Sequence, residues 1–249
     1  MSQPLLATAV LLGQPKPLMK SLRIAFAACL SLAAFPVLAG DGFGRQWMEN
    51  YYQHPAPDAL VQAVYSLNND GYFEDSAQQA TAFGFFSTVF QQNPKQVDSW
   101  LRSSRFLPLH ARRILAIAAW LSGNPVGARH VSELCSTFNY PVRVEVDRLL
   151  AAGPVPVYQT QVASAASMNL RWGAFLASGD EQHIVSVLDA LGSNEPGLAT
   201  SARYALAQDA ASHPRVLEIC REQLDRQPQA IRAEIRALVD DATAQKPRA

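Results

Sequence analysis

Five histidines are the residues of this chain best suited to acid–base chemistry or metal binding: His54, His110, His130, His183 and His213. A zinc site on a helix needs two histidines one turn apart, with a carboxylate close to them. No two of these histidines are that close in the sequence. The spacing therefore predicts no metal centre and no bound cofactor, and it favours surface or helix-capping positions for the histidines.

The sequence has no motif for an activated nucleophile or a phosphate-binding loop. The Gly-x-Ser-x-Gly elbow of hydrolases is absent, as are the P-loop and the Gly-x-Gly-x-x-Gly pattern. The acidic pairs Glu74-Asp75 and Asp240-Asp241 have the right chemistry for an acid and a base. Such pairs more often lie in solvent or stabilise helix ends. We therefore expect no catalytic residue, and an enzyme is the weakest of our functional hypotheses.

Aromatic side chains are concentrated in the N-terminal part of the chain. Thirteen of the twenty aromatic residues after position 39 lie between Phe43 and Phe106. Phe83, Phe86 and Phe90 recur at helical spacing, which predicts one face of a core helix.

Three further aromatic residues precede the first clear helical hairpin: Trp47, Tyr51 and Tyr52. Side chains of this kind supply much of the energy of cores and of interfaces. Two interpretations stay open for them. They clamp the N-terminal segment onto the domain, or they line a binding groove, in which case they are the candidate binding residues.

Residues 20–40 have the anatomy of a secretory signal peptide. Such a peptide needs a basic head, an apolar centre and small residues at the cleavage site. The head carries Lys16, Lys20 and Arg23, the apolar centre covers residues 24–35, and Pro36 precedes a Val-Leu-Ala junction.

We expect cleavage after Ala39, so residues 1–39 are interpreted as a signal peptide and the mature chain as periplasmic or secreted. Met19 would open a more compact leader of the same design. The apolar run is shorter than the roughly 20 residues that span a bilayer, which disfavours a membrane anchor.

The charge balance argues against polyanionic partners. The chain has 21 basic and 21 acidic residues; three of the basic residues and none of the acidic ones precede Gly40. The mature chain thus carries three excess negative charges. Seeing no cluster of basic residues, we expect no binding to nucleic acid. No later segment is apolar over a length that spans a membrane.

Two cysteines follow the leader, Cys135 and Cys220. In an oxidising compartment such a pair can form a disulfide. Both also occupy apolar positions of predicted helices, where a buried free cysteine behaves as a small hydrophobic residue. Both alternatives stay open.

The residues after position 39 predict an all-α fold. Ala, Leu, Gln, Arg and Glu are frequent and favour helix, whereas the alternation typical of strands is absent. We expect an array of antiparallel helical hairpins with about eleven or twelve helices. The predicted helices span residues 45–53, 57–69, 78–91, 94–104, 109–122, 126–138, 141–151, 163–177, 181–191, 197–211, 214–226 and 228–243.

Tight breaks with Pro, Gly or Asp separate these helices near residues 94, 125, 180 and 214. Their spacings are 31, 55 and 34 residues, and two of them approach the 34-residue period of helical-hairpin repeats. This predicts a degenerate repeat. The long interval contains Gly153-Pro154-Val-Pro156, which we interpret as the connection between two halves, residues 40–138 and 161–243, of one helical domain covering residues 40–249.

Gly173 lies inside a predicted helix, beside Trp172. Glycine in a helix interior costs about 1 kcal/mol relative to alanine, so a packing reason is expected. We predict that Gly173 permits another helix to approach closely.

Two segments resemble an uncharacterised group of exported helical proteins from Gram-negative bacteria. The first combines residues 51–55, Tyr-Tyr-Gln-His-Pro, with residues 82–94, Ala-Phe-Gly-Phe-Phe-Ser-Thr-Val-Phe-Gln-Gln-Asn-Pro; the second covers residues 170–180. The resemblance extends over most of the mature chain, and its motifs are structural rather than catalytic. It implies a helical fold and export, and it assigns no functional residue.

Helical-hairpin arrays expose extended faces that mostly bind other molecules. We therefore expect an exported protein-binding or scaffold module of the periplasm, with another envelope protein as its partner. The alternative is a small-molecule or lipid binder whose pocket is lined by the N-terminal aromatic residues.

Overall fold

The computed structural model describes residues 42–136 and 140–244. Every regular element within these ranges is helical: twelve α-helices and four short 3-10 turns, with no strand. This confirms the predicted all-α fold and the number of helices. The expected signal peptide and its cleavage site after Ala39 lie outside the described residues.

The boundaries of the helices agree with the sequence-based expectation to within a few residues. The α-helices are α2 (Phe43–Asn50), α3 (Leu60–Asn69), α4 (Ser76–Gln92), α5 (Val97–Ser103), α6 (Leu109–Leu121), α7 (Pro125–Cys135), α8 (Tyr140–Ala152), α9 (Ala165–Ser178), α10 (Glu181–Asp189), α11 (Pro196–Ser212), α12 (Pro214–Gln223) and α13 (Gln229–Ala244). The 3-10 turns are η1 (Pro57–Ala59), η2 (Ser104–Phe106), η3 (Val157–Gln159) and η4 (Ala190–Gly192).

The breaks between helices have the capping chemistry that their residue types predict. The side chain of Asn124 accepts a hydrogen bond from the backbone N–H of Val126 at the start of α7. Asp180 does the same for Gln182 at the start of α10. Gly179 ends α9 with a φ of 68°, a left-handed conformation that glycine adopts without a steric penalty. These local signals explain why the helix boundaries were predictable.

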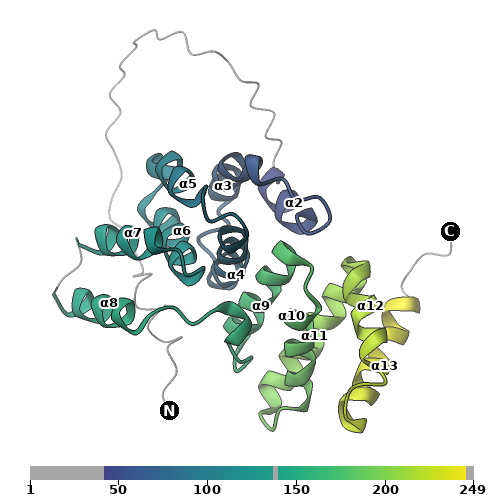
Figure 1. Ribbon diagram of the computed structural model, residues 1–249. Helices are drawn as coiled ribbons and strands as arrows, with labels where there is room; N and C mark the ends of the chain where they lie inside the picture. The colour runs from purple at the N-terminus through teal and green to yellow at the C-terminus, as the bar shows by residue number, and fades with distance from the viewer. Residues whose placement is uncertain (1–41, 137–139, 245–249) are drawn as a thin grey trace, which may run out of the picture.

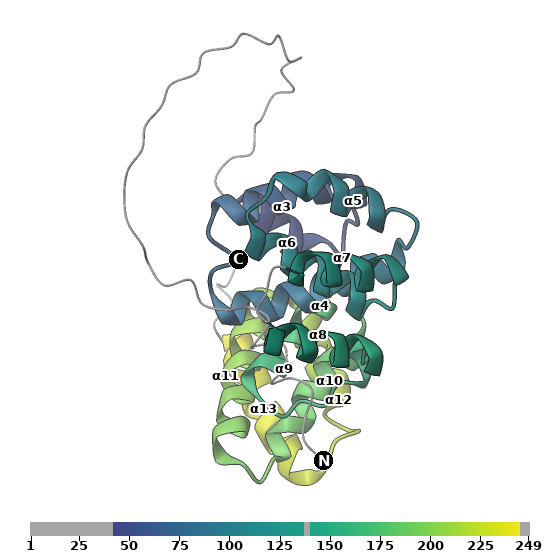
Figure 2. The same ribbon diagram turned by 90° about the vertical axis from the view of Figure 1, so that its left-hand side faces the viewer.

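Two groups of helices make up the molecule. Figure 2 shows α3–α7 in its upper part and α9–α13 in its lower part, and Figure 1 shows α8 beside α7. The two groups meet along α4 and α9, which form the most extensive helix pair in the described residues. One cluster of buried apolar side chains runs through both groups. A regular repeat of hairpins is not shown, and it stays a prediction.

The contact between α4 and α9 depends on two glycines. A Cβ atom on Gly84 would collide with the backbone carbonyl of Leu170, and one on Gly173 would collide with the backbone carbonyl of Thr81. Each glycine therefore lets its own helix approach the backbone of the other. The expected packing role of Gly173 is confirmed, and Gly84 is its counterpart on α4.

Candidate functional site

Trp47 and Tyr51, two of the three candidate binding residues, lie in the core. Trp47 is 8% exposed and Tyr51 1%. Their rings and that of Phe85 form a cluster of edge-to-face contacts, with centroid separations of 4.9–5.3 Å. The indole Nε1 of Trp47 donates to the carbonyl oxygen of Ala56. Because these side chains are enclosed by protein, their burial favours the interpretation in which they pack the N-terminal segment onto the domain.

Tyr52, the third candidate, is half-buried and fastens the N-terminal helix to α9. Its ring lies 5.2 Å from that of Phe175, and its backbone N–H donates to the carbonyl oxygen of Leu176. The three aromatic residues thus clamp α2 onto the domain, which was the first of the two interpretations.

The other residues singled out for their chemistry are dispersed. His54, Asp240 and Asp241 are exposed, and His110 and His213 are half-buried. Asp75 caps the N-terminus of α4 by accepting hydrogen bonds from two backbone N–H groups. Among the residues that the structure describes, no group of three or more His, Cys, Asp or Glu side chains is arranged to hold a metal ion.

Both cysteines are free thiols in the structure, and both are buried. Of the two alternatives, the structure thus contains the buried free cysteine and not the disulfide. Cys135 ends α7, whereas Cys220 lies in α12. Burial raises the pKa of both thiols, that of Cys220 to about 12. A thiol that stays protonated is a poor nucleophile, so neither cysteine has the character of a catalytic residue.

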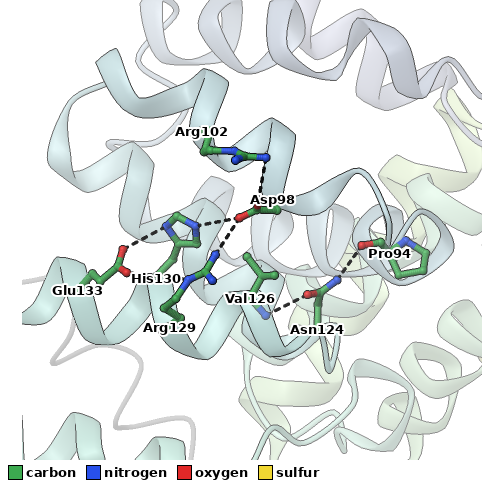
Figure 3. A network of polar contacts seen from close by, with 8 residues as sticks. All are labelled: Pro94, Asp98, Arg102, Asn124, Val126, Arg129, His130 and Glu133. Carbon is green, nitrogen blue, oxygen red and sulfur yellow. Dashed lines mark hydrogen bonds and ion pairs between the residues drawn. The ribbon is translucent and has the colours of Figure 1, made fainter.

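A polar network around Asp98 joins α5 to α7 (Figure 3). One carboxylate oxygen of Asp98 lies 2.9 Å from a guanidinium nitrogen of Arg102, and the other lies 2.9 Å from one of Arg129. His130 lies 3.7 Å from Asp98 and 3.7 Å from Glu133. Exposed ion pairs of this kind each contribute about 0.2–1 kcal/mol to the free energy of unfolding. Their main effect is to position α7 relative to α5.

Asn124 makes a second connection between the same two regions, as Figure 3 also shows. While its side-chain oxygen caps α7, its Nδ2 donates to the carbonyl oxygen of Pro94 at 3.0 Å. One amide side chain therefore fixes both the start of α7 and the turn before α5. Together with Asp98, it holds the walls of a surface recess in place.

This recess, which we name the arginine recess, lies between α5, η2, α6 and α7 and has a volume of about 140 Å³. It is lined by Leu101, Arg102, Ser104, Arg105, Arg112, Leu115, Ala116, His130, Glu133 and Leu134. Three arginines thus surround an apolar floor, with one glutamate among them. Such a lining suits an anionic group that is attached to an apolar one.

The arginines of the recess differ in their partners. Arg102 is paired with Asp98, whereas neither Arg105 nor Arg112 has a carboxylate within ion-pair distance in the described part of the chain. Arg105 instead lies over the ring of Phe106, 4.6 Å from its centroid. Phe106 is 76% exposed, and Leu109 is 42% exposed. Two guanidinium groups without an ion-pair partner among the described residues are therefore accompanied by exposed apolar side chains nearby in the sequence, and Phe106 contacts Arg105 directly.

The recess is not evident from the overall composition, because the chain is near neutral as a whole and the arginines of the recess are not consecutive. A local signal was present. Residues 99–132 contain five arginines and no acidic residue. Charge counted over a window of about one helical hairpin would have identified this segment. The statement that the chain has no cluster of basic residues is corrected accordingly.

A second unusual feature is a buried pair of Arg171 and His183. Arg171 is 5% exposed and donates to the backbone carbonyl oxygens of Tyr158 and Thr160. One of its terminal nitrogens lies 3.2 Å from Nδ1 of His183. Burial and the nearby guanidinium lower the pKa of His183 to about 4. The imidazole is therefore neutral at physiological pH.

The carboxyl group of Asp209 is a weaker acid than an ordinary aspartate. Burial raises the pKa of Asp209, in α11, to about 7. Perturbed carboxyl groups are frequent in active sites, where they work beside a nucleophile or a second acid. Burial alone causes this shift, and the carboxyl group of Asp209 in turn helps to raise the pKa of the neighbouring Cys220 thiol.

Comparison with protein-family models, with curated proteins and with solved structures finds no match for this chain. In the part of the chain that the structure describes, no helix has both the length and the apolar character needed to cross a bilayer.

Proposed function

We propose that this chain is an exported, periplasmic binding module whose arginine recess takes up an acidic segment of another envelope protein. The segment carries an Asp or Glu side chain next to an apolar residue. The proposal keeps the helical binding module expected from the sequence. It moves the binding residues from the N-terminal aromatics to Arg105, Phe106, Leu109 and Arg112.

The observation that carries the proposal is the contrast between Arg105 and Arg112 and the neighbouring Arg102. Arg102 is neutralised by Asp98, whereas the other two arginines have no carboxylate partner among the described residues. Carboxylates bind guanidinium groups in a planar, bidentate geometry. An incoming Asp or Glu would supply the counter-charge that the chain lacks at this place.

The apolar rim favours a peptide over other anions. Exposed Phe106 and Leu109 lie next to the arginines, and large exposed aromatic and Arg side chains are typical energetic centres of protein interfaces. Nucleic acid is disfavoured, because the mature chain carries net negative charge and the recess is small. A lipid or small-molecule pocket at the N-terminal aromatics loses its support, since Trp47 and Tyr51 are enclosed.

The experiment measures fluorescence anisotropy of labelled synthetic peptides with the purified chain at low salt. One peptide alternates Asp or Glu with Phe or Leu, and its matched partner has Asn and Gln in place of the acidic residues. We expect saturable binding of the acidic peptide only. Changing Arg105→Glu together with Arg112→Glu should weaken it at least about tenfold, because like charges then face the peptide.

The control variant carries Arg226→Glu and Arg236→Glu, which make the same charge change at exposed positions of the C-terminal region. It should bind the peptide with nearly the parent affinity. Equal losses in both variants would show a non-specific charge effect and would refute the site. Tighter binding of a single-stranded oligonucleotide than of any acidic peptide would also overturn the proposal.

Export has its own test. Expression of the full chain in a Gram-negative host, followed by periplasmic extraction and N-terminal sequencing, should give a mature protein that starts at Gly40. A chain that keeps its N-terminal residues and stays in the cytoplasm would contradict the periplasmic part of the proposal.

A further inference from the structure

A pocket of about 310 Å³ lies where the two groups of helices meet the connecting segment. We name it the junction pocket. Its walls come from the C-terminal turns of α4 and α6, from residues 154–158, and from the turn between α9 and α10. It is separate from the arginine recess, and it shares no lining residue with it. The volume falls at the lower end of the range of about 300–1,000 Å³ that is typical of small-ligand sites.

His183 supplies a hydrogen-bond donor to this pocket. Its side chain lines the pocket but is only 6% exposed. Arg171 has donors and no acceptors, so Nδ1 of His183 must be the acceptor of their 3.2 Å contact. The imidazole proton therefore lies on Nε2, at the far edge of the ring. Nε2 has no hydrogen-bond partner among the described residues, which leaves a positioned donor without a protein acceptor.

The hydroxyl groups of the pocket are acceptors. Ser87 and Thr88 each donate to the carbonyl oxygen of Gly84, at 3.0 and 2.9 Å, and Ser122 donates to that of Ala119 at 2.6 Å. Because their protons are engaged within the helices, the oxygen lone pairs are left for a ligand. The carboxylate of Asp180 adds a further acceptor at the rim, where one of its oxygens caps α10.

The electrostatics of the pocket disfavour a charged ligand. The carboxylate of Asp180 repels an anionic ligand. The buried guanidinium of Arg171, which lies behind His183, repels a cationic one. A polyol is a ligand that donates and accepts many hydrogen bonds without net charge, and its hydroxyl groups match both the N–H donor and the oxygen acceptors of the pocket. Pro154, Pro156 and Tyr158 supply flat apolar surfaces, which suit the C–H face of a sugar ring.

We propose that the junction pocket binds a neutral carbohydrate of one or two rings, with Nε2–H of His183 and the oxygens of Thr88 and Asp180 contacting its hydroxyl groups and Tyr158 covering one face. The site is independent of the arginine recess. Variants of the junction pocket should therefore lose sugar binding and keep peptide binding, whereas variants of the arginine recess should do the reverse.

The test uses isothermal titration calorimetry of the purified chain with glucose, N-acetylglucosamine, maltose and diacetylchitobiose, and with glutamate and spermidine as charged comparators. We expect at least one of the sugars to bind with a dissociation constant below about 10 mM and the charged compounds not to bind. Absence of binding by all four sugars, or preferential binding of a charged compound, would overturn the proposal.

Variants then locate the site. His183→Leu removes the donor and should weaken sugar binding at least about tenfold, the equivalent of one hydrogen bond. Tyr158→Ala tests the stacking wall at a residue that is 57% exposed, so the fold is not at risk. Tyr204→Ala, at an exposed tyrosine of α11, is the matched control and should change nothing. If Tyr158→Ala binds sugar as the parent does, the proposed site is wrong.

Discussion

Gly84 of α4 and Gly173 of α9 each lie against the backbone of the other's helix. The space that a Cβ atom would need at either position is filled by main-chain atoms, which cannot move aside as a flexible side chain would. The two halves of the chain thus meet through a contact that only glycine allows at these two places. This contact also positions the junction pocket, since its walls include the C-terminal turn of α4 and the turn that follows α9.

The first prediction concerns this contact. Gly173→Ala and Gly84→Ala should each lower the free energy of unfolding by about 1–3 kcal/mol, because overpacking forces the helices apart. Urea denaturation followed by circular dichroism measures the change. Gly197→Ala is the control: nothing lies within 4 Å of its added Cβ atom, so alanine should leave stability unchanged or raise it by up to about 1 kcal/mol. Equal stabilities of the Gly173 and Gly197 variants would contradict the close approach.

The second prediction is that His183 makes the folded state less stable as the pH falls. Its pKa is lowered to about 4 in the folded chain, whereas an unfolded histidine titrates near 6.5. Between these values the unfolded state binds more protons, so this contribution to stability is lost as the pH decreases from about 6.5 to about 4. The groups that act on it are Arg171 and Asp180. Urea unfolding at several pH values should show a flatter profile for His183→Gln than for the parent chain.

The third prediction has the opposite sign. The pKa of Asp209 is raised from 3.8 to about 7 in the folded chain, so the folded state holds a proton that the unfolded state has released. The stabilisation that the folded state gains from protonated Asp209 is complete below about pH 4, and it is lost as the pH rises to about 7. Asp209→Asn should therefore unfold at a higher urea concentration than the parent at pH 8 and match it near pH 4. A variant that is less stable than the parent at pH 8 would contradict the burial of this carboxyl group.

The fourth prediction distinguishes free thiols from a disulfide. Cys135 is 3% exposed and Cys220 is 0% exposed. Neither should react with a thiol reagent in the native protein within minutes, and both should react once the unreduced protein is unfolded in concentrated guanidinium chloride. If the unfolded, unreduced protein contains no reactive thiol, the two cysteines have formed the disulfide that the export pathway would permit.

The sequence could predict what short-range rules determine. The capping residues Asn124 and Asp180, and Gly179 at the end of α9, set helix boundaries through contacts with residues no more than four positions away. Gly173 was predictable because a helical glycine needs a compensating contact. For Trp47 and Tyr51 the sequence left two interpretations open, because an aromatic pattern does not distinguish a core from a groove until the packing partner, here Phe85, is known.

The candidate sites required the three-dimensional structure. Arg171 and His183 are twelve positions apart, and they meet only because the turn at Gly179 folds α10 back on α9. The second partner of Asp98 was similarly hard to foresee: Arg102 lies four residues along the same helix, but Arg129 belongs to α7, which is distant in the sequence. A count of neighbouring charges can suggest a basic segment, but it does not show which arginines remain unneutralised.

The measurement that tests the central claim most directly is photo-crosslinking in the periplasm. Phe106, at the rim of the arginine recess, is replaced by a photoreactive phenylalanine analogue, with Tyr204 as the matched exposed control. Mass spectrometry then identifies the peptide that is joined to the chain after irradiation. We predict that one envelope protein is captured at position 106 and not at position 204, through a peptide with Asp or Glu beside an apolar residue, and that Arg105→Glu with Arg112→Glu abolishes the product. Capture of the same proteins at both positions, or of a peptide without acidic residues, would contradict the proposed function.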